Sequence, residues 1–71
     1  MVELYKLKSE YNRILERYYN GCNYLVEYPE LFDKYINNVM AFKNRLDCLL
    51  IRIQEVQPIN ENEILGGFKL C

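Results

Sequence analysis

The apolar residues between positions 32 and 56 recur with the spacing of an amphipathic helix. Their separations alternate between three and four residues, the a/d pattern of a helix that buries one face against a neighbour. Neither proline nor glycine falls between Glu30 and Gln57. The pattern therefore predicts one unbroken helix with these seam positions: Phe32, Tyr35, Val39, Phe42, Leu46, Leu49, Ile53 and Val56.

The first third of the chain repeats this spacing and predicts a second helix of similar length. Its seam positions are Leu4, Leu7, Tyr11, Ile14, Tyr18, Gly21 and Leu25. Pro29 separates the two patterns, because proline disfavours helix at the residue before it and suits the first turn of a new helix. We therefore expect a turn near residues 27–29. A break at Asn20-Gly21 is the alternative, since such a pair commonly ends a helix.

Residues 1–57 are thus predicted to form an all-helical, antiparallel hairpin of two long helices. Folding the second helix back on the first places Tyr18 near Val39, and it places Gly21 opposite Tyr35.

Residues 58–71 form a tail of different character. Pro58 stops the second helix, and Asn60 followed by Glu63 has the spacing of a capping box. A short helical turn is expected at 61–65, ended by Gly66-Gly67. The tail is rich in apolar residues (Ile59, Ile64, Leu65, Phe68 and Leu70). It therefore either packs back on the hairpin or docks into something else.

A second apolar stripe beside each seam predicts that the chain associates. A two-helix hairpin buries one face of each helix, and a chain of 71 residues builds only a small core. A contiguous apolar surface is rare on soluble monomers. We therefore expect a homodimer that forms a four-helix bundle, or a contact with a protein partner, through Leu15, Tyr19, Val26, Ile36, Met40 and Leu50.

Tyrosine is unusually common, at seven positions. Tyrosine is enriched at protein interfaces because its ring offers both apolar area and a hydrogen bond. Tyr24 and Tyr28 near the turn, together with Phe68 in the tail, are the candidate docking patch for a protein partner.

The residues that usually carry catalysis or bind metals are scarce. The chain has no histidine, and its three cysteines are too widely spaced for a zinc site. We expect no metal, no cofactor and no enzymatic activity. Cys22 and Cys48 are predicted to be buried thiols, whereas Cys71 is the last residue.

Binding of RNA or DNA is the alternative function. Lys6, Arg13 and Arg17 lie close together on the first predicted helix, and small hairpin dimers such as the plasmid copy-number protein Rop bind RNA through a helical face. The resemblance to Rop is one of architecture. Nine basic against ten acidic residues give a net charge of −1, which argues against a chain that is basic over its whole surface.

The tail sequence Glu-Ile-Leu-Gly-Gly-Phe-Lys-Leu, residues 63–70, resembles the endings of small helical proteins from phages and mobile elements of low-GC Gram-positive bacteria. The resemblance covers under a fifth of the chain and implies no catalytic residue. It implies an accessory protein that binds and modulates a host or phage protein. The frequent isoleucine, asparagine, lysine and tyrosine suggest an AT-rich genome. The start of the chain lacks a secretory pattern and no apolar run is long enough for a membrane span, so the expected location is the bacterial cytoplasm.

Overall fold

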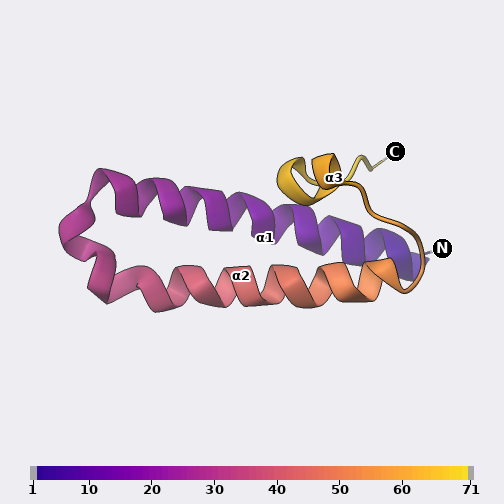
Figure 1. The fold of residues 1–71 in the computed structure, drawn as a ribbon, viewed down its shortest axis with the longest axis horizontal. Coiled ribbons are helices and arrows are strands. Elements are labelled where there is room, and N and C mark those ends of the chain that lie inside the picture. The colour runs from indigo at the N-terminus through magenta and orange to yellow at the C-terminus, as the bar shows by residue number, and fades with distance from the viewer. Residues whose placement is uncertain (1, 71) are drawn as a thin grey trace.

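The computed structural model describes residues 2–70, and all of its regular elements are helical. Helix α1 spans Val2–Glu27, the 3₁₀ turn η1 spans Pro29–Leu31, α2 spans Phe32–Gln54 and α3 spans Glu61–Gly66. No strand occurs among residues 2–70. The two long helices lie antiparallel and side by side, with η1 at one end of the hairpin and both chain ends at the other (Figure 1). The prediction of two long helices and a short third segment is confirmed.

The proline, and not the glycine, ends the first helix. α1 continues through Gly21 without a break and stops at Glu27. Tyr28 then leaves the helical conformation, with φ −125° and ψ 71°, as expected for a residue that precedes proline. Pro29 begins the 3₁₀ turn, so α2 itself begins only at Phe32.

This longer turn changes the pairing of the helices near Gly21. A Cβ atom at Gly21 would lie 3.0 Å from Cγ2 of Val39. The prediction that Gly21 lies opposite Tyr35 is therefore wrong. The three residues of η1 place Val39, about one helical turn further along α2, at this level of α1.

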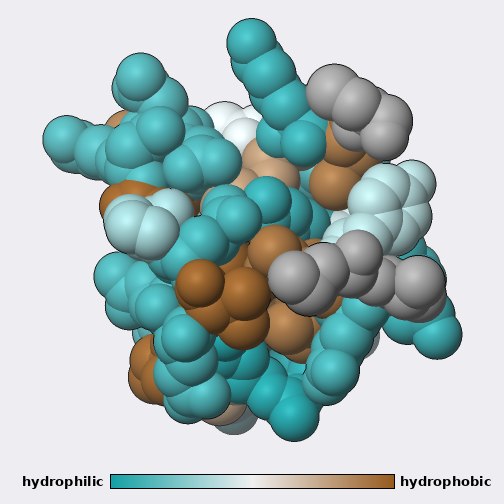
Figure 2. Space-filling view, turned by 90° about the vertical axis from the view of Figure 1, so that its right-hand side faces the viewer, coloured by the Kyte–Doolittle hydropathy of each residue, from teal (hydrophilic) through white to brown (hydrophobic). Residues whose placement is uncertain are grey.

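The main buried cluster lies in the half of the hairpin away from the turn, and Leu25 and Val39 are also buried nearer the turn. α1, α2 and the tail all contribute to this cluster, and Leu49 and Ile53 of α2 have no exposed surface. At this end, apolar side chains gather in the middle of the surface and hydrophilic ones surround them (Figure 2). The cluster consists of Tyr11, Ile14, Leu15, Leu46, Leu49, Ile53 and Phe68.

The tail turns back after α2 and lies against α1, on the side that faces away from α2 in Figure 1. Its helix α3 begins with the predicted capping box. The Glu63 amide donates to Asn60 Oδ1 at 2.9 Å, and the Asn60 amide donates to Glu63 Oε1 at 3.1 Å. α3 ends where Gly67 adopts a positive φ of 91°, a conformation that side chains disfavour.

Candidate interaction surfaces

Phe68 anchors the tail to α1. Its ring is only 5% exposed and meets Tyr11 edge-on, with the ring centroids 5.3 Å apart. Lys8 Nζ lies 5.5 Å from the centre of the same ring. The Asn12 amide group donates to the Phe68 carbonyl at 2.7 Å and accepts from the Phe68 amide at 2.7 Å. Both main-chain polar groups of Phe68 are therefore paired by one side chain.

Two tyrosine hydroxyls hold the end of α3. Tyr11 donates to the carbonyl of Ile64 at 2.6 Å, and Tyr19 donates to the carbonyl of Leu65. Helix carbonyls at a C-terminus lack partners within their own helix, so these bonds satisfy groups that would otherwise need water. The tail therefore packs back on the hairpin, which is one of the two alternatives that the sequence left open.

The packed tail removes some predicted interface residues from the surface. Leu15 is 7% exposed and belongs to the core cluster that includes Phe68, and Leu50 packs against the same cluster. The prediction that Leu15 is part of an exposed stripe is wrong, because the tail covers it. Phe68 likewise cannot be part of an exposed docking patch.

The cysteines differ from the expectation of two buried thiols. Cys22 is partly exposed and Cys48 is exposed. Cys48 precedes the buried Leu49 by one residue, which turns its side chain away from the seam. Cys71 lies outside the described residues. Among residues 2–70, no group of cysteine, histidine, aspartate and glutamate side chains is arranged to hold a metal ion.

Burial raises the pKa of the Tyr11 hydroxyl, and interactions with Tyr19 and Asp47 raise this pKa further. A folded-state pKa above the unfolded value of about 10 favours folding while the hydroxyl is protonated. This contribution is present below about pH 10 and is lost as the pH rises through the folded pKa.

We therefore expect Tyr11→Phe to lower the unfolding free energy by about 0.5–1.5 kcal/mol at pH 7, because the hydrogen bond to the Ile64 carbonyl is lost. The difference in unfolding free energy between wild type and Tyr11→Phe should shrink above pH 10. Urea unfolding at pH 7 and pH 11 measures it. A difference that stays constant would contradict the assignment of this titration to Tyr11.

Beyond the tail, the same side of the hairpin carries an uncovered depression, here called the apolar hollow. Cys22 and Val26 follow Leu15 and Tyr19 by seven residues, or two helical turns, so they continue the stripe that the tail covers. Val26 is 80% exposed. The hollow has a volume of about 260 Å³ and is lined by Tyr18, Cys22, Leu25, Val26, Phe32, Ile36, Val39 and Met40.

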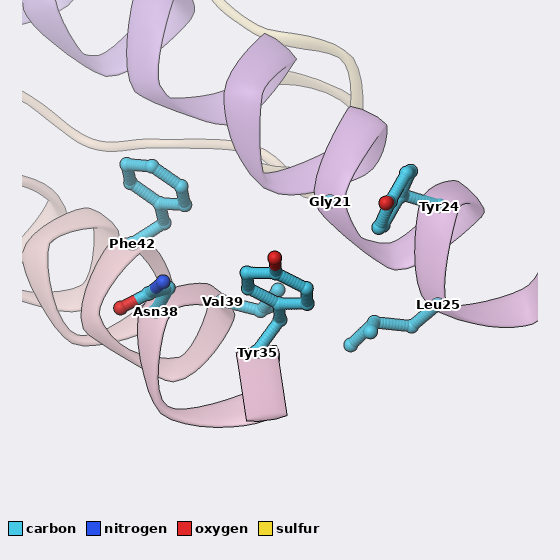
Figure 3. Close-up of a pocket in the computed structure, with 7 residues that line it drawn as sticks. All are labelled: Gly21, Tyr24, Leu25, Tyr35, Asn38, Val39 and Phe42. Carbon is cyan, nitrogen blue, oxygen red and sulfur yellow. The ribbon is translucent and has the colours of Figure 1, made fainter. Parts of the chain in front are cut away.

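A second depression, here called the tyrosine hollow, lies on the other side of the same seam. Its volume is about 340 Å³, and it is lined in part by Gly21, where a Cβ atom would meet Val39. Tyr35 reaches from α2 toward α1, and Tyr24 lies across from it (Figure 3). Their ring centroids are 6.0 Å apart, and the ring of Tyr28 lies 5.0 Å from that of Tyr24 at a tilt of 46°. The lining residues are Gly21, Tyr24, Leu25, Tyr35, Asn38, Val39 and Phe42.

The predicted nucleic-acid contacts Lys6, Arg13 and Arg17 are all exposed on α1. Lys6 and Arg13 border a shallow depression that also includes Glu10. Glu10 is not free, because its carboxylate accepts from Arg45 of α2 at 2.7 Å.

No protein-family model, curated protein or solved structure matches this chain. Within the described residues, no helix is both long enough and apolar enough to cross a membrane.

Proposed function

We propose that this chain is a non-enzymatic protein-interaction module that acts as a homodimer, with the apolar hollow as the contact between the two copies. The observation that carries the proposal is the composition of the hollow. None of its eight lining residues is charged, yet Val26, Phe32 and Met40 are exposed to solvent. Exposed apolar surface of this kind is typical of protein contacts.

A second copy fits this surface because a twofold contact places each patch against itself. A charged residue in such a patch would face the same charge in the second copy, and no charged residue lines this hollow. The tail adds a third layer over one half of this side, where Leu15 is buried. The second copy would supply the third layer over the other half, where Val26 and Met40 remain uncovered. A chain this small also gains stability from association.

The mass in solution tests the proposal. We expect the wild type to have twice the chain mass of 8.6 kDa, and Val26→Glu with Met40→Glu to have the mass of one chain. Each glutamate would have to lose its water inside the interface, which costs several kcal/mol per ion. Light scattering over a range of protein concentrations measures the mass.

Val56→Glu is the matched control. Val56 is 56% exposed and lies beyond the end of α2, at the opposite end of the hairpin from the hollow. This variant should stay dimeric. A wild type that remains monomeric at every concentration would refute the homodimer, and dissociation by Val56→Glu would place the contact elsewhere.

A further inference from the structure

Three of the four basic residues of α1 lie on one side of the helix, whereas the fourth, Lys8, lies over the ring of Phe68 on the tail side. Glu10 faces α2, because it pairs with Arg45 across the gap between the helices. Residues three, four and seven apart share one side of a helix. Lys6, Arg13 and Arg17 lie four residues before, three after and seven after Glu10, so all three lie on the side of α1 that bears this ion pair.

Three of the four basic residues of α2, all except Lys43, lie on the same side of the hairpin. Asn38 lines the tyrosine hollow, and Arg45 follows it by seven residues and pairs with Glu10. Lys34 precedes Asn38 by four residues, and Arg52 follows Arg45 by seven. Lys34 Nζ also lies 5.4 Å from the ring of Tyr35, which lines the hollow.

Six exposed basic residues therefore share one surface, here called the basic face. Glu3 and Glu10 lie on the stripe of α1, and Glu16 and Glu55 follow Arg13 and Arg52 by three residues. Basic residues outnumber acidic ones on this surface, although the whole chain has a net charge of −1. All four arginines of the chain belong to it. The basic face consists of Lys6, Arg13, Arg17, Lys34, Arg45 and Arg52.

The tyrosine hollow lies at the turn end of the basic face. Tyr24 and Tyr28 are exposed, and Tyr24 lines the hollow together with Gly21. A cationic surface beside exposed aromatic rings is the usual arrangement for binding single-stranded nucleic acid, with phosphates on the cations and bases stacked on the rings. An acidic protein would use the cations but would have no need of the rings.

We propose that the basic face and the tyrosine hollow together bind single-stranded nucleic acid, with a base stacked at Tyr24 and Tyr28. From Lys34 to Arg52 the face is on the order of 27 Å long at 1.5 Å per residue, enough for about eight stacked nucleotides at 3.4 Å each. The tail and the apolar hollow occupy the other side of α1, so this binding does not depend on the proposed homodimer.

Fluorescence anisotropy with labelled twelve-residue oligo(U) and oligo(dT) tests the proposal in full-length protein. Both strands share the chemistry that the face would recognise, and comparing them shows whether the sugar matters. Each phosphate contact with a single strand contributes about 0.7 to the slope of log affinity against log salt. Arg13→Ala with Arg17→Ala should reduce that slope by about 1.4 and weaken binding about 25-fold at 0.1 M salt.

Lys43→Ala with Lys69→Ala is the matched control, because it removes the same charge from outside the basic face. Lys43 pairs with Asp47, and Lys69 lies in the tail. Glu10→Gln should act in the opposite direction and strengthen binding about fivefold, because it frees Arg45 for one more phosphate contact. Tyr24→Ala should weaken binding about tenfold without changing the salt slope. Circular dichroism confirms that each variant is folded.

Three results would overturn the proposal. The first is no binding of either oligonucleotide at low salt. The second is equal loss of affinity in the Lys43/Lys69 control, which would mean that only net charge matters. The third is equal binding of poly-glutamate or of duplex DNA, which would mean that the rings take no part. The oligomeric state is measured separately, so failure here leaves the proposed homodimer standing.

Discussion

Replacing Phe68 by alanine is expected to lower the free energy of unfolding by about 3–5 kcal/mol, the usual cost of removing a buried phenylalanine side chain. The ring is 5% exposed and packs edge-on against Tyr11. Its loss would also weaken the paired hydrogen bonds between Asn12 and the Phe68 main chain. Urea unfolding followed by circular dichroism measures the change.

Leu70→Ala is the control for this prediction. Leu70 is also an apolar residue of the tail, but its side chain is exposed, so the change should be within about 0.5 kcal/mol. Hydrogen exchange adds a local measurement, because Phe68→Ala should deprotect the amides of α3 more than those of α2. A loss of only a few tenths of a kcal/mol for Phe68→Ala would mean that the tail does not contribute to the folded state.

The hairpin could be predicted from the sequence because its signals are local. The alternation of three and four residues from Phe32 to Ile53 specifies a helix with one buried face. Pro29 marks the turn through its own backbone restriction. The capping box of Asn60 and Glu63 is likewise contained within four residues. The exact pairing near Gly21 was missed because it depends on how many residues the turn itself uses.

The position of the tail could not be predicted in the same way. Its contacts join residues more than forty positions apart, such as Asn12 with Phe68 and Tyr19 with Leu65. A single asparagine on a helix surface forms no repeating pattern, so Asn12 gives no signal in the sequence. The burial of Leu15 was missed for this reason, since only the tail covers it.

The basic face could not be recognised from the order of charges along the chain, because its residues share one side of two different helices. Basic and acidic residues alternate in sequence, and Glu10 lies between Lys6 and Arg13. In the structure Glu10 is paired with Arg45, a residue of the other helix. Arg45 and Arg52 then add to the same surface, which the sequence of α1 alone could not indicate.

Leu46 and Val56 are both seam positions in the sequence but have very different surroundings in the structure. Leu46 is 3% exposed within the core cluster, whereas Val56 is 56% exposed because α2 ends at Gln54. The helix ends before the last seam position because the amide of Val56 bonds to the carbonyl of Ile53, three residues back, instead of continuing the α-helical pattern. Spacing alone would predict a similar penalty for truncating either residue.

We expect Leu46→Ala to lower the unfolding free energy by about 2–5 kcal/mol, since it leaves a cavity among residues from both long helices. Val56→Ala should change it by less than about 0.5 kcal/mol. Both variants are compared by urea unfolding at one protein concentration, because dimerisation would make stability depend on concentration. Equal losses of unfolding free energy in the two variants would show that the core extends past Gln54. The difference in burial between Leu46 and Val56 would then be wrong.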